Sequence, residues 1–180
     1  FPTRRSSDLV SGVLLAVIDR LKLTHQQQLD FLFTAGAFGL VIANNASISG
    51  AEGGCQAEVG SASAMASAAL VAASGGTPDQ SAQAVAITIK NMMGLICDPV
   101  AGLVEVPCVK RNALGSSQAF ISADMALAGI RSVIPPDEVI HAMYQVGRQM
   151  PQIFKETAEG GLAVTPTAQR LSKEILEKQK

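Results

Sequence analysis

The chain has few cysteines, few aromatic side chains and no tryptophan: three cysteines, one tyrosine and six phenylalanines occur among 180 residues. Three is an odd number and lies far below the cysteine density of small, disulfide-stapled secreted domains. A chain of this length buries a core without such staples. No charged-then-apolar signal peptide opens the sequence. These absences exclude a disulfide scaffold and favour a reducing, cytoplasmic compartment.

Strong charge and long hydrophobic runs are also missing. The formal charge is −1, and Lys110 and Arg111 form an isolated basic pair, so we expect no nucleic-acid partner. The most apolar stretch, residues 31–43, ends at two asparagines. Because a membrane span needs about 20 apolar residues, this stretch predicts a buried helix and no membrane segment.

Helical signals dominate the chain, and strand-like alternation of Val, Ile and Thr is missing. Residues 9–21 show three- and four-residue apolar spacing, Thr24 can cap a helix over 25–43, and the Ala- and Ser-rich residues 56–73 indicate a central, close-packed helix. Thr77, Pro78 and Gln80 form a start signal for a helix to about residue 93. Further helices are expected over about 112–131, from 135 and from 165, with loops at 44–54 and 95–109. The fold class is therefore all-α, a compact single-domain helical bundle with cysteine-bearing loops.

The first nine residues, FPTRRSSDL, are polar and lack periodicity. They match the in-frame translation of a widely used sequencing adapter over their whole length. We interpret residues 1–9 as a non-native, adapter-derived segment, with a natural disordered arm as the alternative. Residues 10–180 are then the C-terminal part of a domain that is expected to begin upstream of Val10.

The three cysteines stand at the ends of expected elements. Cys55 closes a Gly-rich loop, while Cys97 and Cys108 flank a loop that contains proline and glycine. Such positions can converge on one cofactor, but spacing leaves other interpretations open. Each cysteine could be an inert small hydrophobe. Zinc sites usually use C-x2-C pairs, which are absent here, and a lone nucleophile needs a histidine partner, whereas His25 and His141 lie on remote helices.

Three segments carry a resemblance to a known family: SGAEGGCQAEVGSASAMA, GLICDPVAGLVEVPCVKRNA and ETAEGGLAVTPTAQRL. Together they closely resemble the alpha chain of the iron-sulfur-dependent L-serine dehydratases, also called L-serine ammonia-lyases. The resemblance runs from Val10 to the last helix, and its C-D-P-V-x-G-x-V-x-x-P-C motif is highly specific. It implies that Cys55, Cys97 and Cys108 hold a 4Fe-4S cluster with one open, Lewis-acidic iron. It further implies amino acid catabolism and gluconeogenesis through conversion of L-serine to pyruvate and ammonia, without pyridoxal phosphate.

The Gly-rich loop before Cys55 offers backbone N–H groups near a helix start, where a substrate carboxylate is favoured. Ser49, Gly53 and Gly54 are the candidate substrate contacts, a mere turn being the alternative. Around the cysteines, Asp98 and Asn112 are expected to hold the cluster loops through side-chain hydrogen bonds.

The resemblance also implies a partner. Single-chain relatives carry a C-terminal cysteine, whereas this chain ends in LEKQK, which indicates the two-chain subtype with a separate beta chain. The histidine bases of the family lie upstream and in the beta portion, so no base is assigned and the chain alone is expected to be inactive. Glu52 and Glu58 either orient ligands or are solvated. A noncatalytic helical scaffold and an aconitase-like hydro-lyase acting on a hydroxy acid remain open.

Overall fold

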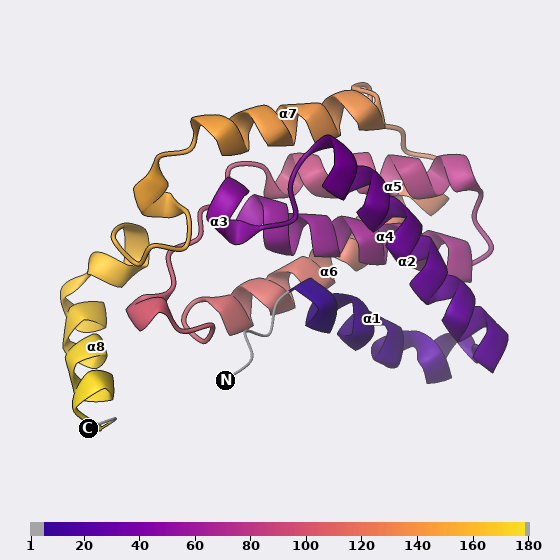
Figure 1. Ribbon diagram of the computed structural model, residues 1–180. Coiled ribbons are helices and arrows are strands. Elements are labelled where there is room, and N and C mark those ends of the chain that lie inside the picture. The colour runs from indigo at the N-terminus through magenta and orange to yellow at the C-terminus, as the bar shows by residue number, and fades with distance from the viewer. Residues whose placement is uncertain (1–5, 179–180) are drawn as a thin grey trace.

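The computed structural model describes residues 6–178, and over this range the chain forms a bundle of eight α-helices without a β-strand (Figure 1). The all-α prediction is therefore confirmed. The helices are α1 (Ser6–Leu21), α2 (His25–Asn45), α3 (Gly50–Gly53), α4 (Ser61–Ala73), α5 (Pro78–Met92), α6 (Cys108–Leu127), α7 (Pro136–Gln149) and α8 (Pro166–Lys178). A π-helical turn spans Gln56–Gly60, and 3-10 turns span Val100–Gly102, Gln152–Phe154 and Gly161–Val164.

Helix α4 lies at the centre of the bundle, as predicted, with α1, α2, α5 and α6 packed around it (Figure 1). Its side chains are small and almost all buried, which lets the neighbouring helices approach closely. One buried hydroxyl on α4 is paired across the core. The Ser63 hydroxyl donates to the carbonyl of Gly115 on α6 at 2.5 Å.

Two helix starts follow the predicted chemistry. Thr24 caps α2 and Thr77 caps α5, each through a capping box closed by a glutamine three residues later. At α5 the Gln80 N–H donates to Thr77 Oγ1 at 3.2 Å, and Pro78 occupies the first turn, where its missing N–H costs no hydrogen bond.

Other boundaries differ from the prediction. Residues 50–53 form the short helix α3 inside the expected loop, and residues 56–60 form a π-helical turn ahead of α4. Helix α6 begins at Cys108 rather than near residue 112. Pro107 sits directly before the first turn, where an N–H would have no partner within the helix, so proline is tolerated there. The helix ends at Leu127 rather than at 131, since Gly129 adopts a left-handed conformation (φ +85°) that stops the helix.

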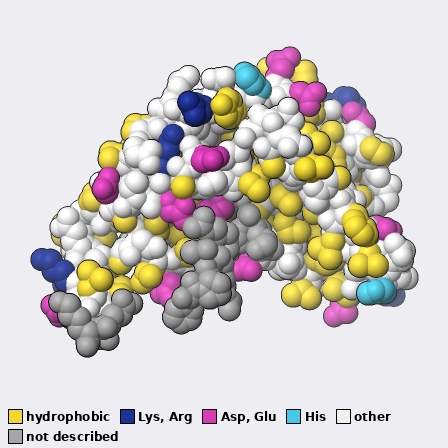
Figure 2. Space-filling view, in the orientation of Figure 1, with side chains coloured by type: hydrophobic (Ala, Val, Ile, Leu, Met, Phe, Trp, Pro, Cys, Tyr) yellow, Lys and Arg dark blue, Asp and Glu magenta, His cyan; other side chains and the backbone are white. Residues whose placement is uncertain are grey.

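The apolar residues 31–43 are buried along one face of α2 only. Phe31 and Ile42 lie in the core, whereas Phe33 and Leu40 are 73% and 63% exposed. Hydrophobic side chains accordingly gather over this side of the molecule in Figure 2. Within residues 6–178, no helix combines the length and the apolar character needed to cross a membrane.

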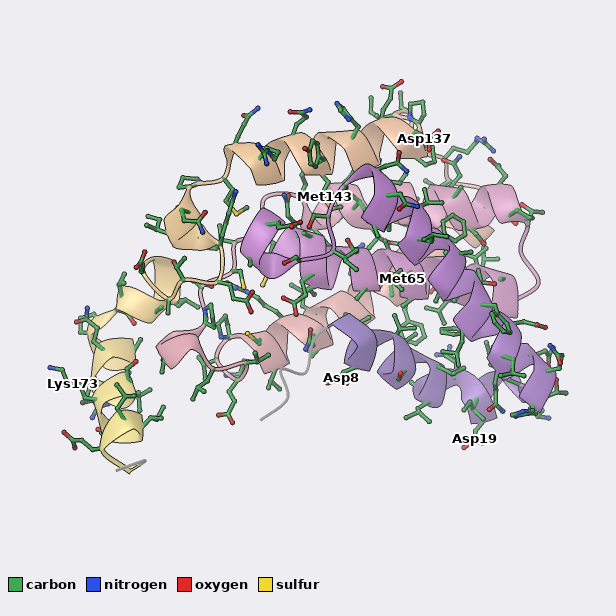
Figure 3. All side chains as sticks on the ribbon, viewed as in Figure 1. Asp8, Asp19, Met65, Asp137, Met143 and Lys173 are labelled. Carbon is green, nitrogen blue, oxygen red and sulfur yellow. The ribbon has the colours of Figure 1, made fainter. Side chains whose placement is uncertain are left out.

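Helix α7 runs along the bundle against α5 and α3, and α8 lies beyond the end of the bundle at which α6 begins (Figure 1). Met143 of α7 is buried between α7 and the helices beneath it, whereas Lys173 points outward from α8 (Figure 3). Helix α8 packs on the two 3-10 turns Val100–Gly102 and Gly161–Val164.

The adapter interpretation of residues 1–9 falls partly outside the described part of the chain, which begins at residue 6. From Ser6 onward the backbone belongs to α1, and Leu9 is 3% exposed in the core. The non-native origin of the segment stays a prediction.

Candidate metal centre

The structure brings the three cysteines together from three separate segments. Cys55 directly precedes the π-helical turn, Cys97 lies in the loop after α5, and Cys108 is the first residue of α6. None of them is in a disulfide, and all three line one small cavity of about 10 Å³. The other residues that line this cavity are Glu58, Val59, Pro99, Val104, Asn112 and Glu156.

Cys97 is held by backbone pairing with the segment that follows α7. Its N–H donates to the carbonyl of Phe154 at 2.8 Å, and its carbonyl accepts from the N–H of Glu156 at 2.9 Å. The pairing forms an isolated parallel bridge with Lys155. The cysteine is 3% exposed. One segment that is distant in sequence therefore fixes its backbone.

Gln56 fixes the segment of Cys55 in the same way. Its backbone N–H donates to the carbonyl of Leu95 at 2.9 Å. Its fully buried side chain donates to the carbonyl of Met143 at 3.0 Å and accepts from the N–H of Gly94 at 2.8 Å. The loop that carries Cys97 and the helix α7 are thus both tied to the residue after Cys55.

Arg111 links these segments to α6. Its Nη1 donates to Asp98 Oδ1 at 2.6 Å and to the carbonyl of Ile96 at 2.9 Å, and it lies 3.9 Å from Cys55 Sγ. Asp98 is 1% exposed, and its other oxygen accepts from the N–H of Leu162 at 2.6 Å. The expectation that Asp98 holds the cysteine loops through hydrogen bonds is confirmed.

Sequence reasoning treated Arg111 as half of an isolated basic pair and missed this role. The signal was its position three residues after Cys108, which places both side chains on one helix face. It becomes visible only once α6 is known to begin at Cys108. Asn112 lines the cysteine cavity, and its predicted hydrogen bonding stays a prediction.

The surroundings shift the pKa values of the three thiols in different directions. The pKa of Cys55 is lowered, because a hydrogen bond from Cys97 and then the charge of Arg111 outweigh the effect of burial. The pKa of Cys97 is raised by donating that hydrogen bond and by its own burial. Burial, together with the charge of Cys55, raises the pKa of Cys108 to about 11. Among the three thiols, Cys55 is therefore the one that loses its proton most readily.

Arg111 keeps its charge in this environment. Burial lowers its pKa, but the hydrogen bond and charge of Asp98 and the charge of Cys55 outweigh that effect and raise it overall. A permanent cation thus lies against the sulfur of Cys55.

The donor set fits an iron-sulfur cluster in kind, since soft thiolates are the usual ligands of such clusters and three of them face one cavity. Over residues 6–178, no three His, Cys, Asp or Glu side chains converge as they would around a single metal ion. In a cluster each cysteine binds a different iron, so the sulfurs surround a volume rather than a point. The present cavity has room for about one water, so the sulfurs would have to move outward around a cluster.

The predicted substrate contacts lie at α3. The N–H of Gly53 donates to the carbonyl of Ser49 at 3.0 Å, and the N–H of Gly54 donates to that of Gly50 at 2.9 Å. Both N–H groups are therefore used inside the helical turn. Contact of Ser49, Gly53 and Gly54 with a substrate stays a prediction.

A larger pocket of about 420 Å³ lies between α3 and α7. Gly53 lines it, as does Lys155, the bridge partner of Cys97. Arg148 adds a second positive charge, and Glu52 adds a negative one whose carboxylate accepts from Ser47 Oγ at 2.6 Å. The two cations complement a carboxylate, and Glu52 complements an ammonium group. These are the two charged groups of a small zwitterion such as an amino acid.

The two histidines lie on the surface, whereas Glu58 is buried. His25 begins α2 and His141 lies on α7, and both are exposed, as expected for helix-face residues. Glu58 is 8% exposed and lines the cysteine cavity, so it is not a solvated surface residue.

Comparison with known proteins gives consistent matches. The family described as "Serine dehydratase alpha chain" matches residues 2–163. The "Probable L-serine dehydratase, alpha chain" of Bacillus subtilis is 67% identical over 97% of this chain and 58% of its own length. The "L-serine dehydratase, alpha chain" of Peptoniphilus asaccharolyticus is 48% identical over 98% of this chain and 60% of its own length. The "L-serine dehydratase 1" of Escherichia coli is 47% identical over 74% of this chain and 30% of its own length. The chain thus spans about three fifths of the two alpha chains.

Proposed function

The chain belongs to the serine dehydratase alpha chain family, and on that premise we propose that it takes part in converting L-serine to pyruvate and ammonia. We propose that Cys55, Cys97 and Cys108 bind the 4Fe-4S cluster that this reaction uses. The convergence of three thiols, from three segments, on one cavity carries this proposal.

The reaction removes the α-proton and the β-hydroxyl of L-serine as water and leaves 2-aminoacrylate, which water hydrolyses to pyruvate and ammonia. A cluster held by three cysteines supplies a Lewis-acidic iron that polarises the C–O bond. The chain's own residues hold that group: Arg111 and Asp98 fix the cysteine segments, and the apolar side chains of Val59 and Val104 line the cavity.

The pocket between α3 and α7 supports binding of an amino acid beside the cysteines. Arg148 and Lys155 would attract the carboxylate of L-serine, and Glu52 would attract its ammonium group. Gly53, one of the predicted substrate contacts, lines this pocket as well.

A separate beta chain is proposed as the partner. Three relatives named as alpha chains are matched over 58%, 60% and 83% of their length, whereas the Escherichia coli relative named L-serine dehydratase 1 is matched over 30%. This difference supports a second chain that carries further parts of the enzyme. We expect the present chain to produce no pyruvate alone and to need a complete alpha chain and a beta chain for activity.

Anaerobic reconstitution with iron and sulfide tests the cluster. The chain should gain a broad absorption band in the blue visible region, and Cys97→Ser should lose it. Val100→Ala is the matched control, because Val100 is buried in the same loop but has no thiol. Absence of the band in the unaltered chain would support the noncatalytic scaffold instead.

A substrate screen of the assembled enzyme tests the reaction. Pyruvate and ammonia should form from L-serine and not from citrate-like hydroxy acids. Conversion of hydroxy acids, with no ammonia from L-serine, would support the aconitase-like alternative. The same screen with L-threonine measures the preference between the two amino acids.

A further inference from the structure

Arg111 contacts the segments of the other two cysteines from its place one turn after Cys108. On the basis of the proposed function, we propose that Arg111 is a positioning residue that holds the three cysteine segments together and stays against the sulfur of Cys55 when the cluster is bound. The contacts are those of one nitrogen, Nη1, with Asp98 Oδ1, the Ile96 carbonyl and Cys55 Sγ.

The position of this guanidinium is fixed from several sides. Arg111 is 15% exposed and Asp98 1% exposed, so the ion pair between them is shielded from water. Asp98 cannot follow a displaced arginine freely, because its second oxygen accepts from the N–H of Leu162. A Cβ on Gly161, which has a φ of +58°, would collide with Asp98. The carboxylate is therefore packed closely against the backbone behind it.

The chemistry of arginine suits this place. All three contacts come from Nη1 at the far end of its guanidinium. A lysine would keep the positive charge, but its side chain is one bond shorter, so its ammonium would not reach all three acceptors from the same backbone position. Charge and positioning can therefore be separated by comparing glutamine with lysine at residue 111.

The contact with Cys55 also has a consequence for the bound cluster. Hydrogen bonds to cluster sulfurs help to set the reduction potential. Removing an N–H donor and a positive charge beside a thiolate ligand stabilises the oxidised, less negative form of the cluster. The potential should therefore become more negative when Arg111 is replaced, and this readout would not move if the arginine only supported the fold.

The chain offers a matched control in Arg131, which pairs with Asp79 at 2.5 Å beyond the opposite end of α6. Both side chains of that pair are more than half exposed, so its contribution is small. The variants are Arg111→Gln, Arg111→Lys and Arg131→Gln, each made in the full 180-residue chain.

The first measurement is the rate of hydrogen exchange at the backbone N–H groups of Gln56 and Cys97, which bond to other segments, in the cluster-free protein, followed by mass spectrometry under native conditions. Arg111→Gln should raise this rate by about ten-fold or more, because loss of hydrogen bonds from a charged group favours local opening. Arg111→Lys should give a smaller increase, and Arg131→Gln should leave the rate unchanged. A folded Arg111→Gln protein with a rate within about two-fold of the unaltered chain would overturn the proposal.

The second measurement is the reduction potential of the reconstituted cluster. Arg111→Gln should have a more negative potential, Arg111→Lys a smaller shift in the same direction because it keeps the charge, and Arg131→Gln no shift; an unaltered potential in Arg111→Gln would overturn the contact with the cluster. If Arg111→Gln does not fold, Arg111→Lys decides both measurements. Failure of the unaltered chain to take up a cluster would overturn the proposed function, while the hydrogen-exchange rates would still decide whether Arg111 holds the segments together.

Discussion

Gly54, the residue before Cys55, shows how closely the cysteine segments are packed. Its φ is +74°, a left-handed conformation that favours glycine. A Cβ at this position would lie 2.6 Å from Met150 Sδ and 2.9 Å from the carbonyl oxygen of Leu95. The methionine is flexible and can move away. The carbonyl cannot do so as easily, because it accepts the N–H of Gln56 at 2.9 Å.

We therefore expect Gly54→Ala to weaken the fold through two separate effects. With φ +74° and ψ −176°, the backbone of Gly54 lies in a region that essentially only glycine adopts, which costs alanine about 1–3 kcal/mol. Forcing a methyl group into a filled space costs typically about 1–3 kcal/mol. The free energy of unfolding should fall by roughly 4 kcal/mol in total. For a chain of this size that corresponds to a decrease in Tm of roughly 8–16 °C.

Gly75→Ala is the comparison in which the packing effect is missing. Gly75 has a φ of +81°, but no heavy atom lies within 4 Å of the Cβ that alanine would add. Only the backbone cost of about 1 kcal/mol should therefore appear. Urea and thermal unfolding, followed by circular dichroism, measure both variants against the unaltered chain. Equal losses of stability in the two variants would refute the argument from packing around Leu95.

Three further predictions concern a helix cap, a thiol and a buried ion pair. Thr77→Ala removes the oxygen that accepts the Gln80 N–H, so urea unfolding should show a loss of about 1 kcal/mol, and no loss would contradict the capping role. Because the pKa of Cys108 is raised to about 11, its iodoacetamide alkylation in the cluster-free protein should still rise about ten-fold per pH unit between about pH 8 and 10, and a plateau below about pH 9 would contradict this. Asp98→Asn leaves the half-buried charge of Arg111 without its counter-charge, so urea unfolding should show a loss of roughly 3 kcal/mol in the free energy of unfolding. A loss below about 1 kcal/mol would mean that the pair is solvated.

Much of the fold follows from local chemistry that the sequence displays directly. Thr24 and Thr77 start helices because their hydroxyls satisfy N–H groups that no residue of the helix can satisfy. The small side chains of residues 61–73 mark the central helix, because a helix with little side-chain volume can be surrounded closely. The exposed face of α2 was not predicted, since Phe33 and Leu40 belong to an apolar run that is equally apolar on both faces.

The candidate site was predictable only in part. Its three cysteines were identified through the resemblance, because spacing alone left them open to other interpretations. Arg111 escaped notice because its partners lie 13 residues or more away in sequence, and tertiary contacts of this kind leave no periodic signal. The π-helical turn after Cys55 was missed for a similar reason, since buried contacts of Gln56 with Met143 and Gly94 accompany it.

Helix α8 supports the segments that carry the cysteines from the outside. It packs on Val100–Gly102, a part of the segment that joins Cys97 to Cys108. It also packs on Gly161–Val164, the turn whose Leu162 N–H donates to Asp98. Cutting the chain before Pro166 would therefore remove the surface against which the segment joining two of the three sulfurs rests.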